Sequence, residues 1–142
     1  AGCGIVLVLS KELKGTFAHG VTKWLTPHKA MIMISLRGLY TDIVWFSLFH
    51  ELGHILLHGK RFDYSASTNT EENEADVFAA NFLIPNEEYD RFVRCFSISE
   101  STIQSFAKSV SIEQGVVVGR LAHDKIIKFN EFVGLKRKYK WS

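Results

Sequence analysis

The stretch VWFSLFHELGHILLHG, residues 44–59, is the longest apolar segment of the chain. Its length and its lack of strict alternation between apolar and polar residues predict a helix rather than a strand. Thr41 or Asp42 is a candidate N-cap, and Gly59 is a candidate C-terminal stop. The stretch therefore predicts a largely buried helix over about residues 41–58, around which the rest of the domain packs.

Polar side chains interrupt this apolar stretch at His50, Glu51 and His54. A buried carboxylate is costly without a partner, and no lysine or arginine lies between residues 45 and 57 to pair with Glu51. Residues four apart lie on one face of a helix, so His50 and His54 can point two imidazoles at one ion, for which Zn²⁺ is the natural choice. Glu51 would stand beside that ion, where it can accept a proton from an attacking water. This H-E-x-x-H spacing is a metallopeptidase signature.

A catalytic zinc ion needs a third protein ligand, which must come from outside this motif. Lys60 stands where one group of zinc peptidases has a third histidine, and His58 drifts away from the face of the motif. Glu71, Glu72 and Glu74 in the next predicted helix compete for the position. A helical wheel centres the apolar face of that helix nearest Glu71 and leaves Glu74 on the flank, so the residues alone leave this choice open.

The remaining segments predict strands first and helices afterwards. Short β-branched or alternating runs predict strands at residues 4–9, 16–26 and 29–36. After a polar loop, helical periodicity begins at about residue 71 and stops at Pro85; further helices are expected from Asn86 and after caps near Ser99 and Ser111. We therefore expect one α+β domain over residues 1–142, with a small, mostly antiparallel sheet packed on a helical bundle that contains the H-E-x-x-H helix.

Composition narrows the class of protein. The chain is 46% apolar and 23% charged with a formal net charge of +2, which is typical of a globular domain and gives no reason to expect nucleic-acid binding by the domain as a whole. The apolar run falls short of a membrane span. Two cysteines, Cys3 and Cys95, without a C-x-x-C pair indicate reduced thiols, and so a cytoplasmic protein. The sequence does not begin with methionine, and we expect it to be the C-terminal part of a longer regulator.

Two segments together, HELGHILLHG and EENEADVFAANFLIP, resemble the ImmA/IrrE family of zinc metallo-endopeptidases. In that family H-E-x-x-H precedes a helix that reads roughly E-A-(N/D)-x-F-A-x-x-L-(L/I)-x-P. The resemblance implies Glu74, just before the alanine, as the third metal ligand beside His50 and His54. Asp76 on the same helix is then a candidate partner that orients a ligand histidine.

The flanking segments GVTKWLTPHKAMIMISLR and GVVVGRLAHD look like the C-terminal domain of HigA-type and XRE-type regulators. Those proteins carry an N-terminal helix-turn-helix, so DNA contact is expected only through such a domain. The resemblance implies zinc-dependent cleavage of a specific protein, such as a partner transcriptional repressor or antitoxin, after stress. The alternative is a non-proteolytic interaction domain of a toxin–antitoxin regulator with a structural or vestigial zinc site. Glu51, which such a site would not need, favours the enzyme.

Hydrolysis of a peptide bond also calls for a donor to the developing oxyanion. His123 and Arg120, in GRLAHD, and Tyr64 in the connecting loop are the candidates. The strand AMIMISL lies just before the helix of the motif, and if it formed a sheet edge it could bind an extended substrate by strand addition.

Overall fold

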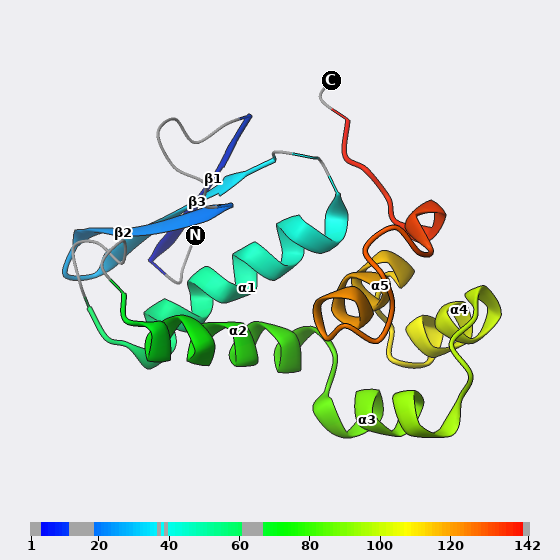
Figure 1. Cartoon of the computed structure of the whole chain (residues 1–142). Helices are drawn as coiled ribbons and strands as arrows, with labels where there is room; N and C mark the ends of the chain where they lie inside the picture. Colours follow the sequence, from blue (N-terminus) through cyan, green and yellow to red (C-terminus); the bar gives the residue numbers. More distant parts are fainter. Residues whose placement is uncertain (1–3, 12–18, 37, 39, 61–66, 141–142) are drawn as a thin grey trace.

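The computed structural model describes residues 4–11, 19–36, 38, 40–60 and 67–140. The chain runs through three strands, β1 (Ile5–Ser10), β2 (Gly20–Thr26) and β3 (Lys29–Ser35), before its first helix. Five α-helices and one short 3₁₀ turn follow (Figure 1). The predicted α+β class, with strands first and helices afterwards, is confirmed.

The three strands form one mixed sheet in the order β1-β3-β2. β2 pairs with β3 in antiparallel register, with Val21 opposite Met33, whereas β1 pairs with β3 in parallel, with Ile5 opposite Ala30. The expected antiparallel pairing therefore holds for one of the two pairs. Parallel neighbours need a crossover, and here residues 11–28, which include β2, provide it.

Because β3 lies between the other two strands, the suggestion that AMIMISL binds a substrate along a free edge is wrong. Both sides of β3 are already paired, and its side chains Ala30, Ile32 and Ile34 are fully buried. The sheet edges belong to β1 and β2.

The helix α1 (Thr41–Leu57) crosses one face of this sheet (Figure 1). Ile32 and Ile34 of β3 pack with Val44 of α1 in one apolar cluster, and Leu48 and Leu52 extend it along the helix. The predicted helix bounds are confirmed to within one residue, and Gly59, at φ +73°, ends the helix in the left-handed conformation. Tyr40, rather than Thr41 or Asp42, occupies the N-cap position, without a side-chain cap.

The helix α2 (Asn69–Leu83) lies alongside α1 (Figure 1). It begins two residues before the predicted start, because Thr68 and Glu71 form a capping box in which each side chain accepts a hydrogen bond from the other's backbone N–H. Ala75 and Ala79 are fully buried. A Cβ added at Gly53 of α1 would lie 3.2 Å from the Cα of Ala75, so the two backbones approach closely only because position 53 lacks a side chain.

We expect Gly53→Ala to lower the free energy of unfolding by about 1–3 kcal/mol, because the new methyl group forces α1 and α2 apart. Urea denaturation of the metal-free protein measures this. Gly134→Ala is the matched control, since a Cβ there would meet nothing within 4 Å. Equal stability of the Gly53 variant and the wild type would contradict the tight helix contact.

The C-terminal helices build a second apolar cluster. It is formed by α3 (Asn86–Cys95), α4 (Glu100–Ser109), α5 (Gln114–His123) and the 3₁₀ turn η1 (Val133–Leu135). Phe92 and Phe106 stack at its centre with ring centroids 4.3 Å apart. Ser99 caps α4 as predicted, but α5 begins after Glu113 and not near Ser111, which has a positive φ of 56°. Among the described helices, none is long and apolar enough to cross a membrane.

Candidate metal centre and adjoining pocket

His50 and His54 face the same point from consecutive turns of α1. Their Nε2 atoms lie 3.1 Å apart. The carboxylate of Glu72 on α2 completes the group, with Oε2 3.1 Å from Nε2 of His50 and Oε1 3.3 Å from Nε2 of His54. Ligands of a tetrahedral zinc ion at bond lengths of about 2.0–2.1 Å lie about 3.3 Å from one another. Within the described part of the chain, these three residues form the group of side chains that could hold a metal ion.

Further hydrogen bonds orient both rings so that Nε2 faces the centre. Asp76 Oδ1 accepts from Nδ1 of His50 at 2.8 Å, which leaves the lone pair of His50 on Nε2. Nδ1 of His54 lies 2.9 Å from Nδ1 of His58, and Nε2 of His58 lies 2.8 Å from Oε2 of Glu74. These contacts fit one set of tautomers, in which His58 donates to Glu74 and accepts from His54. The two Nε2 lone pairs then converge, an arrangement that a cation between them stabilises.

Glu74, the ligand that the family resemblance implies, does not belong to this group among the described residues. It lies two residues beyond Glu72, about 200° further round the helix, and its carboxylate binds His58 instead. Glu71 is engaged in the N-terminal cap of α2. Glu72 and Asp76, one turn apart, share the side of α2 that faces His50.

Glu51 is buried beside the two histidines, at 6% exposure. The hydroxyl of Thr22 in β2 donates to its Oε2 at 2.6 Å. Gly20, at the start of β2, makes room for the carboxylate, since a Cβ there would lie 2.8 Å from Cγ of Glu51. The sheet therefore holds Glu51, whereas the two helices hold the group that could bind a metal.

Burial and neighbouring charges shift the pKa values of these residues in different directions. Burial raises the pKa of Glu51, against the opposing effects of the Thr22 hydrogen bond and the charge of His50. Burial lowers the pKa of His54, and His50 beside it adds to the effect. Burial also opposes the charged form of His50, but the hydrogen bond and negative charge of Asp76 outweigh it, so the pKa of His50 is raised. In the metal-free protein, His50 and Glu51 thus hold a proton more tightly than free side chains do, and His54 holds one less tightly.

The raised pKa of Glu51 predicts a pH-dependent cost in the metal-free protein. A carboxyl group whose folded pKa lies above its unfolded value of about 4.3 destabilises the fold progressively as the pH rises through that window. Glu51→Gln removes this charge, so we expect the variant to be more stable than the wild type at neutral pH and equally stable in acid. Paired urea titrations from about pH 4 to about pH 8 measure the difference. A wild type that gains stability over the variant with rising pH would contradict the prediction.

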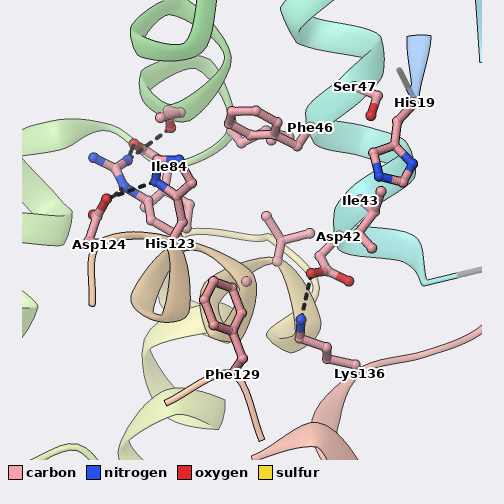
Figure 2. A pocket seen from close by; sticks show the side chains of 15 residues that line it. His19, Asp42, Ile43, Phe46, Ser47, Ile84, His123, Asp124, Phe129 and Lys136 are labelled. Carbon is pink, nitrogen blue, oxygen red and sulfur yellow. Dashed lines mark hydrogen bonds and ion pairs between the residues drawn. The ribbon is translucent and has the colours of Figure 1, made fainter. Parts of the chain in front are cut away.

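An apolar pocket of about 300 Å³ adjoins this group (Figure 2). It lies between α1, the end of α2, and α5. His123 lines it, with its ring 6.1 Å from that of Phe46, whose ring in turn lies 6.3 Å from that of His50. His123 is thus one aromatic ring away from the candidate metal ligands, and its catalytic role stays a prediction.

Arg120 also lines the pocket, but it is already engaged. Its guanidinium donates to the carbonyl oxygens of Ala80 and Ile84 at 2.9 and 2.7 Å, and to Oδ1 of Asn86 at 2.7 Å. It therefore closes the C-terminal end of α2, which makes it a poor oxyanion donor. Tyr64 lies outside the described residues.

The sequence left Glu72 as one of three competing acids and placed His58 away from the face of the motif, although the chain carries signals that favour both residues. The T-x-x-E spacing of Thr68 and Glu71 is a capping box, which assigns Glu71 to the helix start. Glu72 and Asp76 are then one turn apart on a common face. His58 follows His54 at the same four-residue spacing.

One of the comparisons with known proteins identifies a family. No curated protein matches the chain. The family model of the peptidase M78 family, described as the IrrE N-terminal-like domain, matches residues 10–109. The match includes strands β2 and β3 and the helices α1 to α4, and thus both helices of the candidate metal centre. The chain therefore belongs to the IrrE N-terminal-like family of M78 peptidases.

Proposed function

We propose that this protein is a zinc-dependent endopeptidase that cleaves a specific protein, such as a partner transcriptional repressor or antitoxin. The observation that carries the proposal is the convergence of His50 Nε2, His54 Nε2 and the Glu72 carboxylate, with Glu51 buried beside them. Two imidazoles and one carboxylate are a ligand set that suits zinc and leaves a fourth position open. Membership of a peptidase family supports the same chemistry.

Each residue has a distinct proposed role. His50, His54 and Glu72 hold the zinc ion, which when bound would polarise the scissile carbonyl and make a water molecule more acidic. Glu51 accepts the proton from the attacking water and passes it to the leaving amine. Thr22 holds one carboxylate oxygen of Glu51, so the other stays available for this transfer.

Residues around the ligands position them. Asp76 fixes the ring of His50, and the pair His58 and Glu74 fixes that of His54. His123 is proposed to donate to the developing oxyanion once a substrate occupies the pocket. Its side chain is 66% exposed and bonded only weakly to the neighbouring Asp124, at 3.2 Å, so it can turn toward a substrate.

A regulator in the cytoplasm is the proposed substrate because the flanks of the zinc motif resemble the C-terminal domain of DNA-binding regulators. The free thiol of Cys95 lies on the surface, which suits a reducing compartment.

The test is to find the cleavage itself. Zinc-loaded protein is incubated with a native extract of the source organism, and new N-termini are identified by mass spectrometry; protein stripped of metal with a chelator serves as the control. We expect a small number of new termini that require the metal. If the zinc-loaded protein produces none while it captures a regulator intact from the same extract, it is the non-proteolytic interaction domain instead.

A further inference from the structure

The apolar pocket continues the helix face that carries the candidate metal centre. Phe46 precedes His50 by four residues, and Ser47 precedes Glu51 by four, so these wall residues lie one helical turn, about 5.4 Å, before the reactive groups. His19 lines the pocket near Ser47 (Figure 2). It directly precedes Gly20, where an added Cβ would lie 2.8 Å from Cγ of Glu51. The pocket wall on α1 therefore lies one helical turn from His50 and from Glu51, the proposed general base.

The walls of the pocket offer apolar contact. Ile43 and Phe46 line it from α1, Leu83 and Ile84 from α2, and Val116 from α5. The charged side chains in the lining pair with one another. Asp42 binds Nζ of Lys136 at 2.8 Å, and Arg120 lies 3.6 Å from Asp124. Each charge is thus neutralised within the wall, so an apolar group can enter without separating either pair. The second oxygen of Asp42, Oδ1, is buried without a hydrogen-bond partner among the described residues.

The mouth of the pocket carries exposed aromatic surface. Phe129 lines the pocket and yet is 76% exposed, and His123 stands near it with a 66% exposed side chain (Figure 2). An exposed aromatic ring at the mouth of an apolar pocket becomes buried when a ligand binds, and this burial favours binding. At about 300 Å³ the hollow lies at the lower end of ligand pockets, which suits one large side chain.

We propose that this pocket binds a large apolar side chain of the substrate, aromatic or branched aliphatic, at a position next to the scissile bond. The inference rests on the proposed endopeptidase function. An extended peptide advances about 3.3 Å per residue, so a pocket one helical turn from the reactive groups receives a side chain one or two residues from the bond. The pocket thus sets substrate preference.

A binding experiment tests the pocket without any cleavage. The zinc-loaded protein is titrated with acetyl-phenylalanine amide and acetyl-leucine amide, and with acetyl-aspartate amide for comparison, while the methyl resonances of Ile43, Leu83 and Val116 are followed by NMR. We expect saturable shifts with the two apolar probes and none with the acidic one. Shifts at other methyl groups alone, or none at all, would overturn the proposal.

Substitutions that fill the pocket with a larger side chain give a second test of the proposal, with a matched control on the same helix. Ala80→Phe places a ring in the pocket from α2, and Ile43→Phe places one from the opposite wall. Val77→Phe is the control, because Val77 is 61% exposed on the same helix and does not line the pocket. We expect either filling variant to abolish the shifts with zinc affinity unchanged, and the control to preserve them. Shifts that persist in both correctly folded filling variants would contradict the assignment.

The cleavage profile distinguishes failure of this proposal from failure of the proposed function. On a peptide library made from a proteome digest, wild-type protein should favour a large apolar residue at one position flanking the cut. Ala80→Phe should lower kcat/KM for those peptides by about 10- to 200-fold relative to peptides with alanine there. Cleavage without an apolar preference would refute the pocket proposal and leave the peptidase intact. No cleavage by zinc-loaded protein of either the library or the native extract would refute the peptidase, and the NMR titration would still decide what the pocket binds.

Discussion

Glu51→Gln should lower kcat for cleavage by roughly 10²- to 10⁴-fold while the protein keeps its zinc. The amide has nearly the same shape as the carboxylate and can still accept the hydrogen bond from Thr22, but it cannot take up a proton from water. The loss should appear in kcat with little change in KM, because the missing interaction belongs to the transition state. Single-turnover kinetics on a peptide spanning an identified cleavage site measure it.

Glu87→Gln is the control for this experiment, since it makes the same substitution on the exposed first turn of α3. Zinc content by elemental analysis should be equal in the wild type and both variants. Wild-type rates in Glu51→Gln with full zinc occupancy would remove Glu51 from the reaction.

Glu72→Gln should weaken zinc binding by more than about 100-fold, whereas Glu74→Gln should weaken it by no more than about 10- to 100-fold. Glu72 lies against both ligand nitrogens, while Glu74 reaches the centre only through His58 and His54. Competition with a chromophoric chelator gives the affinities. The two variants remove one charge each from the same helix, so each serves as the other's control for net charge.

The opposite order of affinities would restore Glu74 as the ligand. Thermal unfolding adds an independent measurement, because a ligand that binds only the folded state raises its stability in proportion to the logarithm of the ratio of its concentration to its Kd. Saturating zinc should therefore raise Tm in the wild type and Glu74→Gln at concentrations that leave Tm of Glu72→Gln unchanged.

The sequence predicted the part of the centre that lies within one helix. His50, Glu51 and His54 are related only by helical geometry, so their spacing predicted their common face. Which acid reaches the two histidines depends on how α2 is rotated against α1, a tertiary property of the contact in which Gly53 lies close to Ala75. The choice of Glu74 followed the family pattern over the helical wheel, which centred on Glu71; the acid that lies against the two histidines is Glu72, about 100° round the helix from Glu71.

The topology of the sheet was likewise not predictable from local sequence patterns. The β-branched runs predicted which segments form strands. The strand order β1-β3-β2, however, depends on pairing between segments that are distant in the sequence. The hydrogen-bond partner of Glu51 could not be predicted for the same reason. Thr22 lies 29 residues away in the sequence, on a strand that only the tertiary fold brings beside α1.

The candidate metal ligands and the proposed general base are held by different parts of the chain. Among the described residues, the side chains that bond to the ligand histidines come from α1 and α2, while the hydroxyl that donates to Glu51 comes from β2. On the proposed mechanism, a substitution in β2 would therefore abolish cleavage and leave metal affinity unchanged. An intact H-E-x-x-H motif with full zinc occupancy would then not be enough for activity, and the residue at position 22 would be a further requirement.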